Sequence, residues 1–61
     1  EVHRDSFGRV ISVSYYTEDK DLIKTEFYSG SRICTINQYR QGHLYSTGEY
    51  KDDLLISKSI S

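Results

Sequence analysis

The chain contains no proline, methionine or tryptophan, and Cys34 is the only cysteine among its 61 residues. A lone cysteine cannot form a disulfide within the chain, so the composition implies no oxidising compartment. No apolar run approaches the ~20 residues that a membrane-crossing helix requires, which predicts that the chain has no membrane span. These absences leave the localisation of the protein unknown.

The chain also lacks an excess of charge of either sign. It has 8 Lys and Arg residues against 9 Asp and Glu residues, giving a net charge of -1, and both signs are interspersed. No basic stripe is available to neutralise phosphates, which argues against nucleic acid as a partner. A chain of this length forms one domain at most and buries only about 60% of its unfolded surface. We therefore expect a single β domain over residues 1–61 with a thin core.

Aromatic residues recur at a nearly constant interval. Tyr16, Tyr28, Tyr39 and Tyr50 are 12, 11 and 11 residues apart, and an aliphatic residue follows each one after a short polar turn. The segments between the turns are rich in β-branched and aromatic residues, which is typical of strands. This pattern predicts an all-β fold, a five-stranded antiparallel meander of about 11-residue repeats. Its strands are expected at residues 10–16, 22–28, 33–39, 44–50 and 55–61.

The start of the chain departs from this pattern. The turn at residues 6–9 implies that residues 1–5 belong to a preceding strand, and Asp5 stands where a tyrosine is expected. We expect that strand to be truncated or frayed.

Strict alternation of side chains predicts two unlike faces. One face is expected to carry the four spaced tyrosines at the strand ends and small polar residues between them. The other is expected to be mostly apolar and to need cover. It would carry Ile11, Val13, Tyr15, Ile23, Phe27, Cys34, Ile36, Tyr45, Ile56 and Ile60.

Three arrangements would bury such an apolar face. The sheet could close into a small barrel, stack on an identical copy, or continue into further repeats of a longer chain. The apolar content of this face falls from the first predicted strand to the fourth, where Tyr45 is its only large apolar residue. This gradient favours an open or docked sheet over an evenly filled barrel.

Residues with catalytic or metal-binding chemistry are sparse. His3 and His43 are forty residues apart and lack the spacing of zinc ligands, and Cys34 lies in an apolar strand where a thiol usually acts as a small hydrophobe. The acidic turn at residues 18–21 lacks the glycine and the terminal glutamate of a calcium-binding loop. We therefore expect no enzyme activity, no metal and no cofactor.

Four short stretches carry a resemblance to two known families. Residues 26–33 (EFYSGSRI), 39–44 (YRQGHL) and 47–50 (TGEY) resemble the variant MORN repeat of bacterial proteins labelled antitoxin components, over about residues 6–55. Residues 5–10 (DSFGRV) are similar to the unit of YD-repeat proteins, which build β shells around secreted toxins. The resemblance implies repeated β-hairpins in an extended sheet that makes protein or surface contacts rather than performing catalysis. Asp5 and the pair Asp52 and Asp53 depart from these patterns.

The sequence favours a non-catalytic protein-binding or self-assembly module that uses a sheet face or a free strand edge. The partner would be another protein or a further copy of the chain. The alternative is a small barrel that binds single-stranded nucleic acid or another polymer through exposed tyrosines, since bases stack on aromatic rings. For the protein contact, the candidate residues are Tyr16, Tyr28, Tyr39, Tyr45, Tyr50 and Ile56.

Overall fold

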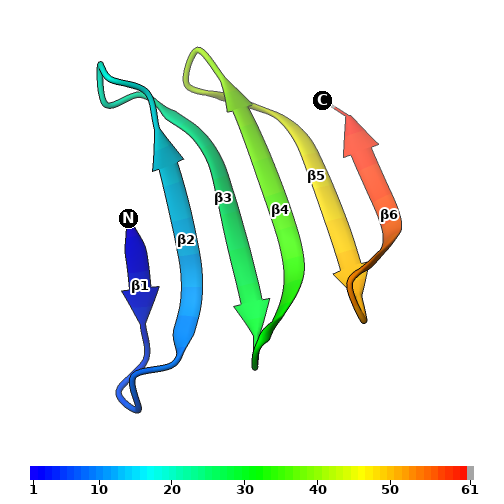
Figure 1. Ribbon diagram of the computed structural model, residues 1–61. Helices are drawn as coiled ribbons and strands as arrows, with labels where there is room; N and C mark the ends of the chain where they lie inside the picture. Colours follow the sequence, from blue (N-terminus) through cyan, green and yellow to red (C-terminus); the bar gives the residue numbers. More distant parts are fainter. Residues whose placement is uncertain (61) are drawn as a thin grey trace.

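The computed structural model of the chain describes residues 1–60, which form one antiparallel sheet with its strands in sequence order (Figure 1). The prediction of an all-β antiparallel meander is confirmed. Within the described residues there are six strands rather than the five predicted: β1 Val2–Arg4, β2 Val10–Tyr16, β3 Leu22–Ser29, β4 Arg32–Arg40, β5 His43–Lys51 and β6 Leu54–Ile60. The predicted strand boundaries agree to within one residue for β2 to β5, and the predicted end of β6 at Ser61 lies outside the described residues.

The last three hairpins close through two-residue loops. Gln41 and Gly42 have φ values of 50° and 81°, and Asp52 and Asp53 have φ values of 53° and 65°. Two successive residues with positive φ form the type I′ turn, whose twist matches that of the flanking strands. Aspartate tolerates this conformation better than most residues, which explains how a loop without glycine can connect β5 to β6.

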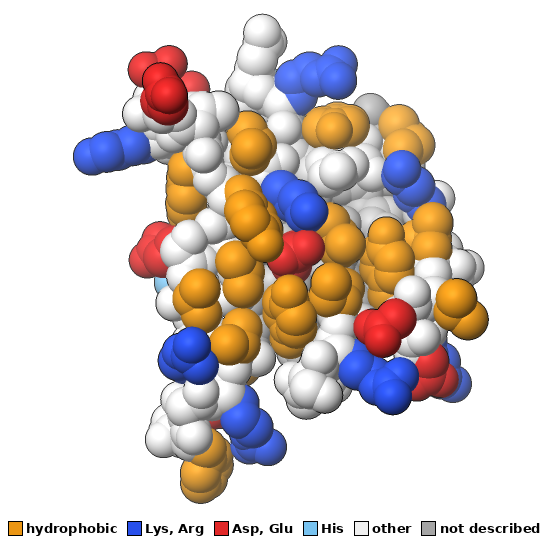
Figure 2. Space-filling view, viewed as in Figure 1, with side chains coloured by type: hydrophobic (Ala, Val, Ile, Leu, Met, Phe, Trp, Pro, Cys, Tyr) orange, Lys and Arg blue, Asp and Glu red, His pale blue; other side chains and the backbone are white. Residues whose placement is uncertain are grey.

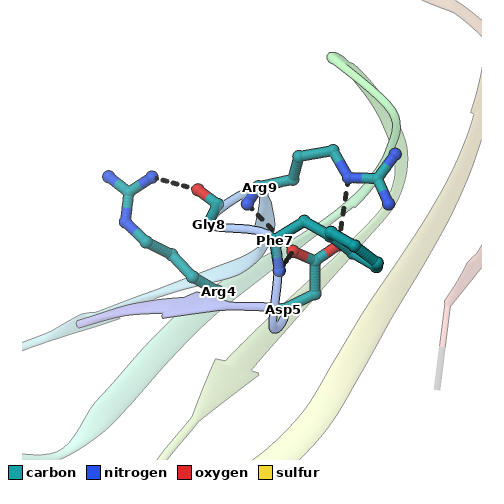
Figure 3. Close-up of polar contacts among 5 residues, drawn as sticks. All are labelled: Arg4, Asp5, Phe7, Gly8 and Arg9. Carbon is teal, nitrogen blue, oxygen red and sulfur yellow. Dashed lines mark hydrogen bonds and ion pairs between the residues drawn. The ribbon is translucent and has the colours of Figure 1, made fainter.

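The turn between β1 and β2 is organised by Asp5 (Figure 3). Its Oδ1 atom accepts hydrogen bonds from the backbone N–H groups of Phe7 (2.9 Å) and Arg9 (3.0 Å). Its Oδ2 atom accepts a bond from Arg9 Nε at 3.1 Å, and Arg4 reaches the carbonyl oxygen of Gly8 at 2.9 Å. The carboxylate thus supplies acceptors for backbone N–H groups that an open loop would leave without a partner. Asp5 thus fits its position as a turn residue and needs no tyrosine there.

The strand that the five-strand prediction did not include is β1, which is short and lies at one edge of the sheet. Val2 pairs with Val13 and His3 pairs with Ser12 on β2. Backbone bonds at the turn join Asp5 N–H to the carbonyl oxygen of Arg9 at 2.9 Å. The sequence indicated a truncated or frayed strand within residues 1–5 but did not count it among the five strands, and the structure shows that residues 2–4 pair with β2.

Every hairpin contains a one-residue irregularity. Tyr15 pairs with Lys24, but Tyr16 pairs with Leu22, so Ile23 is the extra residue. The same shift leaves one unpaired residue in each of the other hairpins, namely Ile11, Cys34, Tyr45 and Ile56. A bulge of this kind reverses the alternation of side chains beyond it. The faces of the sheet therefore cannot be read from strict alternation along the sequence.

The predicted distribution of the tyrosines over the two faces is wrong for this reason. The pairing register places Tyr28 and Tyr50 on the same side of the sheet as Val13 and Ile36. By the same register, Tyr16 and Tyr39 lie on the opposite side. The spaced tyrosines thus alternate between the two faces from one hairpin to the next.

The sheet is a single open layer, and the barrel alternative is not observed. The described residues measure 32 × 27 × 13 Å, and β1 and β6 form the two edges. Within residues 1–60 no hydrophobic side chain is buried, so the layer has no core of its own. No helical segment in this range has the length and hydropathy that crossing a bilayer requires.

Candidate protein-contact face

The pairing register defines an apolar face and a polar face. Two rows of directly paired residues cross the middle of the apolar face from β2 to β6. The first row is Val13, Glu26, Ile36, Gly48 and Lys58, and the second is Tyr15, Lys24, Gln38, Ser46 and Ile60. Nearer the strand ends, the pairs Tyr28 with Ile33 and Tyr50 with Leu55 complete this face.

The apolar face is open to solvent. Figure 2 shows one side of the molecule on which hydrophobic side chains form a nearly continuous area, with acidic and basic side chains near its middle. Large side chains of the apolar face that remain exposed include Tyr15, Leu55 and Ile60, the last with 69% of its surface accessible. Exposed apolar areas of this extent on one side of a small protein mark contact sites.

A hydrogen-bonded cluster lies in the middle of the apolar face. Glu26 is only 7% exposed. Its Oε1 atom accepts hydrogen bonds from the hydroxyl groups of Tyr15 at 2.7 Å and Tyr28 at 3.3 Å. Its Oε2 atom lies 3.4 Å from Lys24 Nζ, and this ammonium group also stands 5.1 Å from the centre of the Tyr15 ring. The buried carboxylate is therefore fully paired inside the chain, as a buried charge must be.

This cluster shifts the pKa values of its members. Burial alone would raise the pKa of Glu26, but the hydrogen bonds from Tyr15 and Lys24, the Lys24 charge and the bond from Tyr28 outweigh it and lower the pKa. The pKa of Tyr15 is raised, chiefly because its hydroxyl donates to Glu26. The pKa of Tyr28 is raised by burial first and then by the Glu26 charge. Each shift favours the state in which Glu26 is ionised and both phenols are protonated.

The Glu26 cluster predicts a pH dependence of stability. Because the pKa of Glu26 is lower in the folded chain, its contribution is present above the ordinary value near 4.5 and is lost as pH falls through the folded pKa. The raised pKa of Tyr15 gives a contribution that is present below pH 10.0 and is lost as pH rises through the folded pKa. Glu26→Gln is expected to remove the loss on the acid side and to cost about 1 kcal/mol at pH 7.

Urea unfolding followed by circular dichroism at a series of pH values measures this effect. Glu49→Gln is the matched control, since Glu49 is an exposed carboxylate on the other side of the sheet. Equal acid slopes for the wild type and Glu26→Gln would contradict the assigned role of Glu26.

The polar face is built differently. One row of directly paired residues crosses it from β2 to β6 and contains only small polar side chains. The row is Ser14, Thr25, Asn37, Thr47 and Ser59. The hydroxyl groups of Ser14 and Thr25 lie 3.4 Å apart, within hydrogen-bonding distance. Ser14 and Thr25 are only 8% and 7% exposed. Three large exposed side chains also lie on this side of the sheet, namely Tyr16, Phe27 and Leu44.

The apolar face has a hollow over β5. A cavity of about 220 Å³ is lined by residues that include Ser46, Gly48 and Tyr50. A Cβ atom at Gly48 would stand 3.3 Å from both Leu55 Cδ1 and Tyr50 Cε1, so neighbouring side chains already occupy part of the space above this glycine. Ser46 is only 2% exposed. In the two central rows, β5 thus carries the small residues Gly48 and Ser46, and β2 carries the larger Val13 and Tyr15.

The candidate contact residues are divided between surfaces. The apolar face carries Tyr28 and Tyr50, whereas Tyr16 and Tyr39 lie on the polar side. Tyr45 and Ile56 are bulge residues, and the guanidinium of Arg40 stands 4.9 Å from the centre of the Tyr45 ring. The structure therefore brings one of the six candidate residues, Tyr28, into contact with Glu26, and it places Tyr50 elsewhere on the same face.

Sequence reasoning missed the Glu26 cluster. The signal was present, since Lys24, Glu26 and Tyr28 are two residues apart and therefore point to the same side of β3. A hairpin register was needed to add Tyr15.

The residues weighed for chemistry do not converge. Cys34 is a half-buried free thiol whose Sγ atom lies 3.4 Å from the carbonyl oxygen of Phe27. His3 lies 3.9 Å from a Glu1 carboxylate oxygen in exposed surroundings. Among the described residues, no three side chains of the metal-binding types lie close enough together to hold an ion.

Comparisons with protein-family models, with curated proteins and with solved structures gave no match to this chain. The resemblance to variant MORN and YD repeats remains a prediction from the residues that carry it.

Proposed function

We propose that the chain is a non-catalytic protein-binding or self-assembly module, and that its apolar face is the main contact surface. The observation that carries this proposal is that no hydrophobic side chain is buried within residues 1–60. Burying one Ile or Phe side chain is worth roughly 1.5 to 3 kcal/mol. A second layer on the apolar face would supply the burial that a single sheet cannot supply alone.

The free edge of β6 is the second surface available to a partner. All its residues from Leu54 to Ile60 are exposed, and Lys58 is its only charged residue. An unblocked edge strand can add a strand of another chain through backbone hydrogen bonds. The apolar face is the stronger candidate because edge pairing would leave that face uncovered.

Replacement of Ile36 by lysine tests the face directly. Ile36 lies in the middle of the apolar face on the central strand β4. A lysine there would be enclosed beside the Glu26 carboxylate, which is already paired with Lys24 and two tyrosine hydroxyl groups, so Ile36→Lys is expected to weaken association by ~100-fold. Thr35→Lys is the matched control, because it places the same charge on the same strand facing the other way.

Light scattering during gel filtration over a concentration series measures this loss of association. Circular dichroism shows whether each variant keeps its β structure. Equal loss in both variants, or in neither, would contradict the assignment of the apolar face.

A further inference from the structure

The size of the apolar face matches one side of a stable protein interface. The two longer dimensions of the sheet are 32 and 27 Å, which give a face of roughly 860 Å², and specific interfaces bury ~800 Å² per partner. The sheet is 13 Å thick, so the far side of the layer offers the face no cover. One layer of equal area would therefore cover the face completely.

The charge on the apolar face places a condition on that layer. The Glu26 carboxylate is already paired with Tyr15, Tyr28 and Lys24. Lys58 lines one side of the hollow from the exposed edge strand β6, and its ammonium group can extend to water at the rim. A partner on this face needs to bring no counter-charge, and an identical face meets this condition.

The distribution of large and small side chains makes the apolar face complementary to a second copy of itself. The sheet has its middle between β3 and β4, so a two-fold axis there, parallel to the strands, would place β2 of one copy over β5 of the other. On β2 the two central rows carry the large residues Val13 and Tyr15, and on β5 they carry Gly48 and Ser46. The large residues on β2 would then meet the hollow over β5 twice, as an interface between identical surfaces requires.

We propose that the apolar face is covered by the same face of a second copy, forming a two-layer sandwich in which β2 of each copy packs into the hollow over β5 of the other. This inference rests on the proposed function and names its partner. The packing is that of two aligned sheets about 10 Å apart.

Thiol crosslinking across the interface tests the arrangement. In a Cys34→Ser background, Tyr15→Cys and Ser46→Cys are combined in one chain. Within a chain these positions lie in one row, three strands or ~14 Å apart. In the sandwich they face each other between copies with Cα atoms ~10 Å apart, which is too far for a disulfide but within reach of a short bifunctional thiol reagent that cannot span the distance within a chain. Such a reagent is expected to give a covalent dimer of nearly all the protein. The matched control combines Ser14→Cys and Thr47→Cys, which occupy the same two strands on the polar face.

Each outcome decides between the proposals. A covalent dimer from the apolar-face pair but not from the control supports the sandwich. Equal yields from both pairs reflect random collision and overturn it. Association by light scattering without selective crosslinking would keep the self-assembly function and overturn the face-to-face arrangement. A monomer at every concentration, with β structure retained, would overturn both. The same experiment with Val13→Cys and Gly48→Cys, which face each other in the neighbouring row, repeats the test with the Tyr15 hydrogen bond intact.

Discussion

On the proposed self-association, dilution of the protein by 100-fold is expected to lower its apparent free energy of unfolding by about 2.7 kcal/mol per mole of dimer, because folding would be coupled to association. The physical reason is the absence of buried hydrophobic side chains in the described single layer. A sheet of this kind gains its apolar burial only when a second layer is present. Urea unfolding followed by circular dichroism at two concentrations measures the shift.

The Ile36→Lys variant serves as the control for this dilution experiment. Its free energy of unfolding should be lower at both concentrations and should change less between them. Superimposable wild-type curves would contradict the coupling of folding to association.

Replacement of Gly42 by valine is expected to lower the free energy of unfolding by about 2 kcal/mol, since the left-handed backbone conformation is costly for β-branched residues. Gly42 has a φ of 81°, and a Cβ atom there would meet nothing within 4 Å. The cost would therefore come from the backbone conformation alone. Thermal or urea unfolding of the two proteins at equal concentration measures the difference.

Asp53→Gly is the partner experiment with the opposite sign. Asp53 has a φ of 65° in the loop between β5 and β6. Glycine relieves the strain of this conformation, so the variant is expected to gain about 0.5 kcal/mol. Asp52 is left unchanged because its Oδ1 atom lies 3.2 Å from Arg32 Nη1. A loss of stability in Asp53→Gly, or none in Gly42→Val, would mean that these loops do not have the described conformation.

The sequence predicted the strands well because each is bounded by residues that favour turns. The aromatic spacing and the positions of Gly30, Gly42 and Asp52 located the last three hairpins. The turn at residues 6–9 indicated the short strand β1, but Val2–Arg4 is too short to show a periodic pattern, so it was not counted among the five strands. The role of Asp5 was missed because it depends on side-chain hydrogen bonds that composition alone does not reveal.

The two faces could not be predicted because each hairpin contains one extra residue. A shift of one residue moves every later side chain to the opposite face. Strict alternation thus placed Tyr28 with Tyr16, whereas the structure places Tyr28 beside Glu26 and Tyr15. The fall in apolar content towards β5 was readable from the sequence, but its meaning required the register. Small residues on β5 line a hollow there, and the large residues Val13 and Tyr15 lie in the same rows on β2.

Small-angle X-ray scattering tests the central claim, which is that a second layer covers the apolar face. The Cα radius of gyration of one chain is 12.2 Å. Two sheets stacked ~10 Å apart would give a radius of gyration of about 13 Å with the mass of two chains. Two sheets joined through their edges would have centres ~29 Å apart and a radius of about 19 Å, given the spacing between strands. The sandwich predicts a doubled mass with the smaller radius. A doubled mass with the larger radius, or the mass of a single folded chain, would contradict it.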